Sequence, residues 1–413
     1  LCRKYIILPI LLSVIVSQVQ FNRIAPTDYY LGDARSMGMG NSIVSNCRTS
    51  ILSLSNPAGL SDLNNSIYFQ SSFSSIFERR SIVITDMWGD FLANADYVFN
   101  DNSYLKNSFG FNYTLFPLNE KIRTTVAFSY MPFSSFNYSY EEEVRSDADL
   151  EDGIIGIDDP IIGFHVLRNT GDVYVGSLGF SCSFNRFMSI GVGINQLQEA
   201  SIKDEVYIDI VDNTAYSQNN LSNVENHEDS FSLEKTGFIT LSLKLKKDDI
   251  SIVGSFEQDA LIKSKTSGSF HISDQLGLPI VFDLNDGIMN YNIEGLSYQK
   301  PSKYNIGILY EPKYNSDFSI VFETTKKTWN HNTEYGKFLD NKVLEYRFGF
   351  EYAPVKGFPV RAGLVYSESP FLALGPKTTL TLGTGKIFNK TVLDFAMNYN
   401  TVSYMHHDLF PSE

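Results

Sequence analysis

The sequence predicts an all-β protein, an antiparallel transmembrane β-barrel, on the basis of three observations. From Asn65 onward, apolar and polar residues alternate with period two in segments of about 10 to 14 residues. Short connections alternate with long ones between these segments, which is typical of barrels with tight turns at one rim and long loops at the other. Aromatic residues make up 14% of the chain and charged residues 19%, below the roughly 25% charge of ordinary soluble domains. A soluble β-sandwich also alternates, but it has no reason to sort its connections in this way.

The N-terminal stretch, residues 1–17, has the parts of a secretory signal peptide. Arg3 and Lys4 precede an apolar run over residues 5–16. No later run approaches the roughly 18 consecutive apolar residues of a membrane helix, so the mature chain is either soluble and exported or crosses a membrane as strands. Cys47 and Cys182 remain after cleavage. We expect two separate thiols, because Cys182 lies on a strand face that should meet lipid.

The next segment, residues 18–65, is predicted to be a compact plug, or hatch, ahead of the barrel. Glycines and small polar residues dominate residues 33–63 and permit an irregular, tightly folded backbone. Its Asn-Pro-Ala-Gly run predicts a turn, because a residue before proline is extended and glycine permits the next bend. The candidate hatch residues are Arg35, Gly38, Gly40, Asn56, Pro57, Ala58 and Gly59.

Residues 66–413 are predicted to form the barrel. Strands are expected at residues 66–85, 107–116, 121–136, 172–184, 187–202, 231–246, 249–269, 301–312, 317–330, 342–353, 358–368, 377–388 and 391–404. Long loops are expected at residues 86–106, 137–171, 203–230, 270–300, 332–341 and 369–376. Because single-chain bacterial barrels have an even number of strands, we expect about fourteen. Either a hairpin is hidden near residues 78–80 or the closing strand is lacking, and we favour a chain whose last strand was lost beyond Glu413.

Charged residues on the polar faces of the later strands are expected to line the lumen, because a charge facing lipid at mid-depth costs about 2–4 kcal/mol. These candidate lumen residues are Glu323, Glu345, Arg347, Glu351, Arg361 and Asp394. We expect them to pair with one another and with polar hatch groups such as Asp33 and Arg35. The alternative is that Arg347 or Arg361 binds the carboxylate of a fatty-acid-like ligand through a bidentate contact.

Four stretches resemble the FadL family of outer-membrane transport barrels and its PorV-like relatives. In the hatch, Ala-Arg is followed by Met-Gly-Met-Gly and then by Asn-Pro-Ala-Gly, and further similar stretches lie at residues 300–307, 345–363 and 381–396. The resemblance implies a fourteen-stranded barrel with the hatch inside its lumen, in the outer membrane of a Gram-negative-type bacterium and surrounded by its lipid. It implies passive uptake of hydrophobic small molecules such as long-chain fatty acids, by binding and hatch-gated diffusion. The alternative is a PorV-like docking or shuttle component that contacts proteins of a secretion system.

Other classes of protein find little support. The net charge of −14 argues against a nucleic-acid partner, because phosphate binding needs clustered Lys and Arg. Gly-x-Ser-x-Gly, phosphate-loop and His-Glu-x-x-His patterns are absent from the sequence, so we expect no enzyme, with a hidden catalytic set around His165 or His271 as the alternative. We expect neither a cofactor nor a metal. The acidic residues of the 140–160 segment lack EF-hand spacing, and the His-His-Asp run at 406–408 lacks a third ligand at a fixed spacing.

Overall fold

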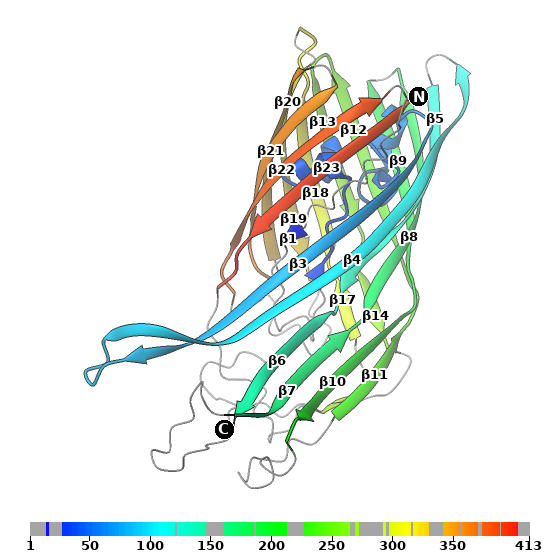
Figure 1. Ribbon diagram of the computed structural model, residues 1–413. Helices are drawn as coiled ribbons and strands as arrows, with labels where there is room; N and C mark the ends of the chain where they lie inside the picture. The colour runs from blue at the N-terminus through cyan, green and yellow to red at the C-terminus, as the bar shows by residue number, and fades with distance from the viewer. Residues whose placement is uncertain are drawn as a thin grey trace, which may run out of the picture.

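An antiparallel sheet curves into the wall of a barrel around short N-terminal helices (Figure 1). The computed structural model describes residues 14–15, 27–119, 122–145, 160–185, 187–212, 227–264, 269–271, 292–294, 297–314, 317–329, 342–355, 357–370, 374–388 and 390–403. The predicted signal peptide, residues 1–17, lies almost entirely outside these residues. Its cleavage stays a prediction. No helix among the described residues is both long enough and apolar enough to cross a membrane.

Thirteen long strands, each antiparallel to the next, form the wall. They are β3 (Ser66–Thr85), β4 (Phe91–Asn119), β5 (Ile122–Ser135), β8 (Asp172–Phe184), β9 (Met188–Leu197), β12 (Thr236–Lys247), β13 (Ile250–Glu257), β18 (Ser302–Tyr310), β19 (Phe318–Thr328), β20 (Lys342–Val355), β21 (Phe358–Ser367), β22 (Lys377–Phe388) and β23 (Thr391–Asn400). The first and last of them run in the same direction. The short β1 (Val14–Ile15) pairs in parallel with β3 and also contacts β23.

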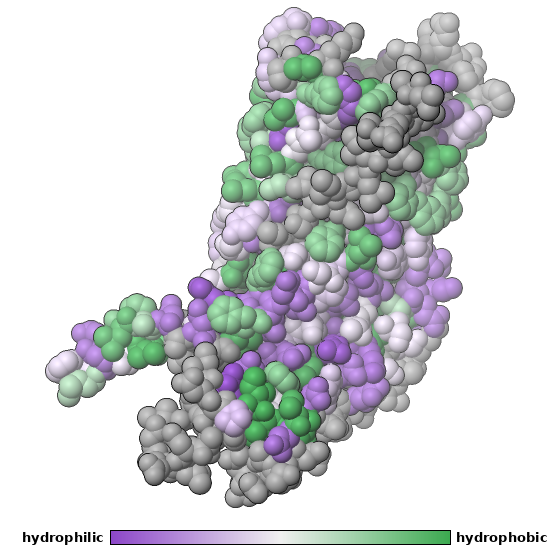
Figure 2. Space-filling model, in the orientation of Figure 1, coloured by the Kyte–Doolittle hydropathy of each residue, from purple (hydrophilic) through white to green (hydrophobic). Residues whose placement is uncertain are grey.

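The two faces of the wall differ in polarity as the alternation predicts. Large apolar side chains point outward and stay exposed on the isolated chain, and they dominate the outer surface of the upper part of the barrel in Figure 2. Examples from the wall strands are Phe109, Phe111, Leu178, Phe180, Val192, Ile194, Leu241, Leu243, Ile306, Ile308, Phe322, Phe348, Leu364, Leu380 and Leu382. Their strand neighbours point inward and are mostly small, polar or charged, with Leu309, Val321 and Val365 as buried apolar exceptions. An apolar exterior around a polar interior is the pattern of a barrel immersed in lipid.

Tight turns join the strands at one rim. Asn185 and Asp248 lie in two of these turns with positive φ of 49° and 54°, a conformation that Asn and Asp tolerate better than most residues. Both positions fall in connections that were predicted to be short.

The expectation of long loops over residues 137–171 and 203–230 is wrong, because both ranges contain strands. Residues 137–171 contain β6 (Tyr138–Arg145) and β7 (Ile161–Thr170), and residues 203–230 contain most of β10 (Ala200–Ile210) and the beginning of β11 (His227–Leu233). These strands form a separate four-stranded sheet in the order β11-β10-β7-β6. β6 and β10 both contain adjacent acidic residues, and pairing across four strands offsets the low strand propensity of those acids.

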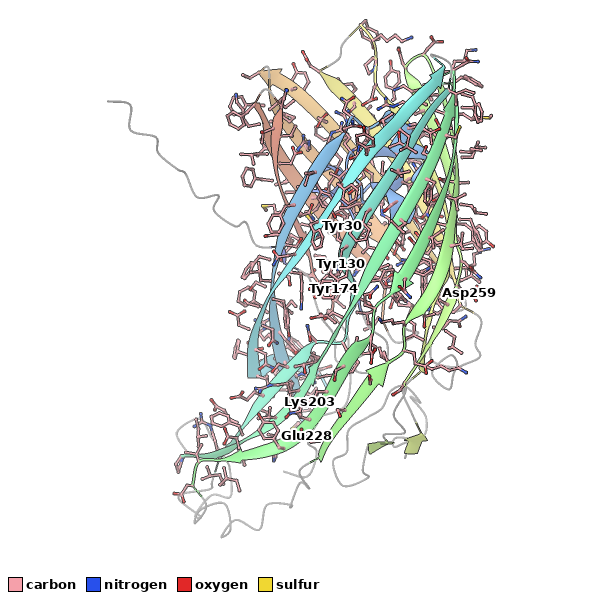
Figure 3. All side chains as sticks on the ribbon, turned by 90° about the vertical axis from the view of Figure 1, so that its right-hand side faces the viewer. Tyr30, Tyr130, Tyr174, Lys203, Glu228 and Asp259 are labelled. Atoms are coloured by element: carbon pink, nitrogen blue, oxygen red, sulfur yellow. The ribbon has the colours of Figure 1, made fainter. Side chains whose placement is uncertain are left out.

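Three predicted wall strands are each divided in two where the barrel sheet ends. β9 gives way to β10 at residues 198–199, β11 to β12 at residues 234–235, and β13 to β14 (Ala260–Lys263) at residues 258–259. β14 pairs with β17 (Ser297–Lys300), and β15 (Ser269–His271) pairs with β16 (Asn292–Glu294). Figure 3 shows Tyr130 and Tyr174 at mid-height on the wall and Lys203 with Glu228 on the four-stranded sheet beyond it. The two tyrosine rings stack with centroids 5.3 Å apart, as in an aromatic girdle at a membrane interface.

The loop expected over residues 86–106 is also wrong, because most of it belongs to β4. β3 and β4 stay paired from Ser66 opposite Asn112 to Thr85 opposite Phe91. The polar residues that interrupt the apolar alternation of β4 are accommodated because each is paired across the ladder with β3. The end of this hairpin leaves the barrel sideways (Figure 1).

Candidate functional site in the barrel lumen

The hatch lies inside the barrel and is built from short helical segments. They are α1 (Ala34–Gly38), α2 (Ile43–Asn46), α3 (Leu52–Ser55) and the 3-10 helix η2 (Pro57–Asp62). Asp33 caps α1, because its carboxylate accepts a 2.8 Å hydrogen bond from the backbone N–H of Ser36. Asn56 caps η2 by accepting from the N–H of Gly59 at 3.3 Å, and its amide donates to the carbonyl of Val44 at 2.6 Å. The Asn-Pro-Ala-Gly run therefore begins a 3-10 helix and ties it to the middle of the hatch.

Glycines of the wall allow the hatch backbone to lie directly against the strands. Gly349 of β20 and Gly363 of β21 face Met39 and Gly40, and a Cβ on either wall glycine would overlap the hatch backbone. Gly40 has φ of +69°, which favours glycine at this position. The other wall glycines in such contact with the hatch backbone are Gly179, Gly191, Gly193 and Gly383, while Gly110 and Gly307 face the hatch side chains of Ser50 and Ser45. The hatch and the wall are therefore complementary at the level of the backbone.

Polar side chains of the wall also hydrogen-bond the hatch backbone near α1 and α2. The hydroxyl of Thr381 accepts from the N–H of Gly40 at 2.9 Å and donates to the carbonyl of Gly38 at 3.2 Å. The carboxylate of Glu323 accepts from the N–H of Ser45 at 2.6 Å. These bonds satisfy buried backbone groups that have no helical partner.

The opposite end of the hatch is held by a different part of the wall. The N–H of Ala58 donates to the hydroxyl of Ser242 at 2.7 Å, and its carbonyl accepts from Ser181 at 3.1 Å. Asp62 forms an ion pair with Lys244 at 2.5 Å. The hatch is thus attached on both sides of the lumen.

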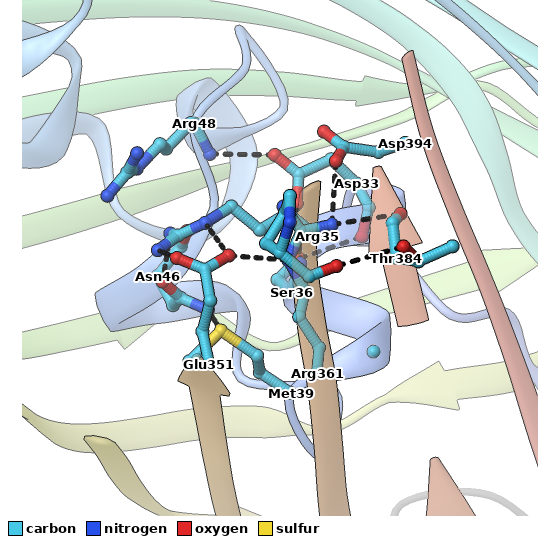
Figure 4. A network of polar contacts seen from close by, with 12 residues as sticks. Asp33, Arg35, Ser36, Met39, Asn46, Arg48, Glu351, Arg361, Thr384 and Asp394 are labelled. Atoms are coloured by element: carbon cyan, nitrogen blue, oxygen red, sulfur yellow. Dashed lines mark hydrogen bonds and ion pairs between the residues drawn. The ribbon is translucent and has the colours of Figure 1, made fainter. Parts of the chain in front are cut away.

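An ionic network with buried arginines and partly buried carboxylates joins α1 to the last strands of the wall (Figure 4). The Arg35 guanidinium contacts both carboxylate oxygens of Glu351, at 3.1 and 2.8 Å, and also donates to Asn46. Arg361 contacts the same Glu351 at 2.5 Å and Asp394 at 2.6 Å. Three candidate lumen residues therefore pair with one another and with a candidate hatch residue.

A second ionic network involves the other candidates and the first described residues of the hatch, ahead of α1. Glu345 pairs with Arg347 and, at 2.7 Å, with Lys327. Asp28 of β2 (Thr27–Asp28) pairs with Lys327 at 3.1 Å and with Lys303 at 3.3 Å. Burial alone would raise the pKa of the Asp28 carboxyl, but the two lysines outweigh it and lower this pKa to about 2.

The two candidate arginines differ in how fully they are paired. Arg361 has Glu351, Asp394 and the carbonyl of Thr384 as acceptors. Arg347 donates to Glu345 and, at 2.6 Å, to the hydroxyl of Thr325, while its Nε is buried without a partner among the described residues.

The other side of the lumen is apolar. Buried hydrophobic side chains of β5, β8 to β12 and β14 form one continuous cluster with those of the hatch, which we call the apolar lumen cluster. Its members are Leu31, Cys47, Ile51, Leu52, Leu54, Leu60, Leu63, Ala127, Met131, Phe133, Phe136, Val173, Val175, Leu197, Ala200, Ile202, Leu233, Phe238, Ala260 and Ile262. The lumen therefore has an ionic side on β18 to β23 and an apolar side on the strands across from it.

Sequence analysis did not identify Asp28, Lys303 and Lys327 as lumen residues. Lys303 and Lys327 alternate with outward-facing residues of β18 and β19, so the period-two pattern carried the signal for both. Nothing local in the sequence places Asp28 beside them, because the two lysines follow it by about 275 and 299 residues.

The remaining expectations about reactive groups concern the cysteines and metals. Cys47 and Cys182 are free thiols, which confirms that they do not pair with each other. No group of three or more metal-binding side chains occurs among the described residues. Most of the acidic 140–160 segment, and all of residues 406–408, lie outside the residues that the structure describes.

The chain therefore has the fold of a transmembrane β-barrel with its N-terminal segment folded inside the lumen, which confirms the predicted fold class. The crystal structure of a Pseudomonas aeruginosa FadL homologue is similar over 92% of this chain and 92% of that chain, with a TM-score of 0.51 and 12% identity. The Pseudomonas putida toluene transporter TodX is similar over 90% of this chain and 92% of that one, with a TM-score of 0.48 and 14% identity. No protein-family model and no curated protein matches the sequence. The fold is thus that of the FadL-type barrels.

Proposed function

We propose that the chain is an outer-membrane channel of a Gram-negative-type bacterium that takes up hydrophobic small molecules, such as long-chain fatty acids, by binding and hatch-gated diffusion. The apolar lumen cluster carries this proposal, because it continues from Ile202 and Ala260 on the loop side to Leu54 and Leu60 of the hatch. Burying apolar surface there stabilises a bound ligand by about 25 cal/mol per Å². The fold likeness to the FadL homologue supports the same class of function.

The gate in this proposal is the segment over residues 27–31. It touches both sides of the lumen, since Leu31 belongs to the apolar lumen cluster and Asp28 to the second ionic network. Within the described part of the chain, its backbone pairs with β5 at Ser134 and Ser135 and through a 3.0 Å bond from the N–H of Tyr29 to the carbonyl of Phe133, and the side chains of Tyr29 and Tyr30 bond Asp172 and Ser36. Residues 33–63 are tied to the wall throughout by glycine contacts and hydrogen bonds. A ligand that fills the cluster takes the place of Leu31 and so displaces this segment first.

Ligand binding by a polar variant of the apolar side tests the proposal. Val175 on β8 is fully buried in the apolar lumen cluster, and Thr379 on β22 is a buried residue of the ionic side. We expect Val175→Asn to weaken the binding of both laurate and toluene by roughly tenfold, which corresponds to about 1.4 kcal/mol. The matched variant Thr379→Asn should leave both affinities within about twofold. Equal affinities for the wild type and both variants, with normal assembly, would reject a ligand path along the apolar side.

The fatty-acid part of the proposal depends on a cation for the carboxylate. We assign this role to Arg347 rather than Arg361, because the buried Nε of Arg347 lacks a partner among the described residues. We expect Arg347→Ala to weaken laurate binding and leave toluene binding unchanged, since toluene has no carboxylate. Unchanged laurate binding by correctly assembled Arg347→Ala would remove this residue from the mechanism without affecting the proposal for neutral ligands.

A PorV-like docking role remains the competing proposal, and the same variants separate the two. A docking protein needs its outer surface rather than an apolar lumen, so Val175→Asn would alter neither cargo release nor partner binding. Uptake of labelled fatty acid into proteoliposomes supports the channel if it is saturable and lost in Val175→Asn.

A further inference from the structure

The β3–β4 hairpin continues past the barrel as a projecting arm, which we define as residues 81–96. At its root, Arg80 donates to the hydroxyl of Tyr138 at 2.9 Å and lies over the ring of Tyr140 at 4.4 Å. The ladder has an irregularity directly after this point, between Arg80 and Ser81. Beyond it the arm extends sideways from the barrel in Figure 1, and among the residues with described placement its two strands pair with each other alone.

The arm exposes large apolar side chains that a protein surface in water normally keeps few and scattered. They are Val83, Ile84, Met87, Trp88, Phe91 and Leu92. Met87 and Trp88 at the tip are 84% and 79% exposed. Figure 2 shows apolar surface along this arm, separated from the apolar belt of the barrel by a polar zone.

The tip that presents these residues is a fixed turn. The carboxylate of Asp86 accepts hydrogen bonds from the N–H groups of Trp88 and Asp90, both at 2.9 Å. Gly89 adopts φ of +87°, and its N–H donates to the carbonyl of Asp86 at 3.0 Å. Met87 and Trp88 are thus held outward by a hydrogen-bonded turn rather than left exposed by a lack of structure.

We propose that the arm is a membrane-surface anchor whose tip inserts into the interfacial region of the lipid that surrounds the barrel. The arm continues the same two strands whose outward face meets lipid at Ile67 and Phe69, and Phe77 and Phe99 extend that exposed face toward it. It leaves the barrel sideways, and so overlies the surrounding lipid rather than the lumen. Tryptophan and other aromatic residues favour the membrane–water interface.

The negative charge of the arm determines which lipid headgroups favour its binding. Residues 81–96 contain Asp86, Asp90 and Asp96 and neither Lys nor Arg. The insertion is therefore driven by apolar side chains, and negative headgroups oppose it. Zwitterionic lipid should bind the arm better than strongly anionic lipid.

Trp88 is a built-in probe for this proposal, because the chain has only two tryptophans. Trp329→Phe makes Trp88 the sole tryptophan, and Trp88→Phe is the matched control that retains Trp329. Both full-length proteins are reconstituted into phosphatidylcholine vesicles, with and without lipid brominated near the headgroup end of its acyl chains. We expect the bromolipid to quench Trp88 emission at least twofold, with little quenching by aqueous iodide. Replacing a third of the lipid by phosphatidylglycerol should reduce the bromolipid effect.

Two results would overturn the proposal. Strong iodide quenching without bromolipid quenching would place the tip in water. Protection from both quenchers that grows with the protein-to-lipid ratio would place it against a second copy of the chain. Neither result depends on ligand uptake, so the arm and the proposed channel are tested separately.

Discussion

At the residue scale, the charges inside this barrel are arranged as pairs between distant segments. Arg35 reaches across to Glu351, which in turn binds Arg361, and Asp28 reaches Lys303 and Lys327. Removing one partner of a buried pair leaves an uncompensated charge. These side chains therefore hold the hatch in one position as well as filling the lumen.

The pair between Arg35 and Glu351 gives the sharpest test of this arrangement. We expect Arg35→Met to lower the free energy of unfolding by about 2–3 kcal/mol, because it removes the charged hydrogen bonds to Glu351 and Asn46 and leaves Glu351 with Arg361 alone. Arg48→Met is the matched control, since the Arg48 side chain is 57% exposed in its 2.8 Å ion pair with Glu311, and it should cost at most about 1 kcal/mol. Urea titration in lipid vesicles measures both. Similar losses of unfolding free energy in the two variants would show that the Arg35 contact stabilises the protein no more than an exposed surface ion pair does.

Asp28 predicts a pH dependence with a defined sign. Its carboxyl pKa falls from 3.8 to about 2 in the folded chain, so the folded state favours the charged form. The stabilisation is complete above the unfolded pKa and is lost as the pH falls through about 2. We therefore expect the stability difference between wild type and Asp28→Asn to be constant from pH 8 to about pH 5 and to shrink below about pH 4. A difference that shrinks between pH 8 and pH 6 would contradict this assignment.

At the scale of elements, the glycines of β20 and β21 define where the hatch sits. Alternation predicts which strand residues face inward, and at Gly349 and Gly363 the inward space is filled by hatch backbone. The same strands carry apolar residues outward, so one element serves both lipid and hatch. At its base, the β3–β4 hairpin also turns apolar residues toward lipid. Beyond Arg80, it no longer belongs to the barrel wall.

A methyl group on a wall glycine that contacts the hatch backbone should displace the hatch. We expect Gly363→Ala to destabilise the protein by about 1–3 kcal/mol, as overpacking does, and to raise the leak of a small polar dye through proteoliposomes. Gly254→Ala on β13 is the control, because a Cβ there meets nothing within 4 Å. Equal leak through both variants would mean that the wall glycines do not position the hatch.

At the scale of the whole molecule, the chain is organised with its apolar surface outside and its ionic groups inside. The outward apolar residues would be unfavourably exposed in water. In a membrane, they form the main contact of the barrel with lipid. The lumen divides between an ionic side that pairs with the hatch and an apolar side that continues to the loop rim.

A charge placed on the lipid-facing surface tests this arrangement. Phe322 lies near the middle of β19, between the exposed Ile308 and Phe348 of the neighbouring strands. We expect Phe322→Arg to cost about 2–4 kcal/mol of folding free energy in vesicles, because the charge enters hydrocarbon. Tyr314→Arg in an exposed turn should cost about 0–1 kcal/mol. A negligible loss for Phe322→Arg, measured by urea titration, would mean that this face does not meet lipid.

The sequence by itself determined the wall of the barrel and the position of the hatch in the chain. Period-two alternation is local, so the strands around Phe109, Phe128, Phe348 and Phe395 could be recognised without tertiary information. The same pattern marked the inward charges, because a charged side chain cannot face hydrocarbon cheaply.

Only the tertiary structure decided which distant groups meet. The pairing of Arg35 with Glu351 and the contact of Gly40 with Gly363 join residues more than 300 positions apart, and no local pattern encodes such partners. The four-stranded sheet and the projecting arm were missed for a related reason: their acidic and amide residues have low strand propensity, and pairing with neighbouring strands overrides it. Local periodicity specifies the face of a residue, whereas packing across the lumen specifies its partner.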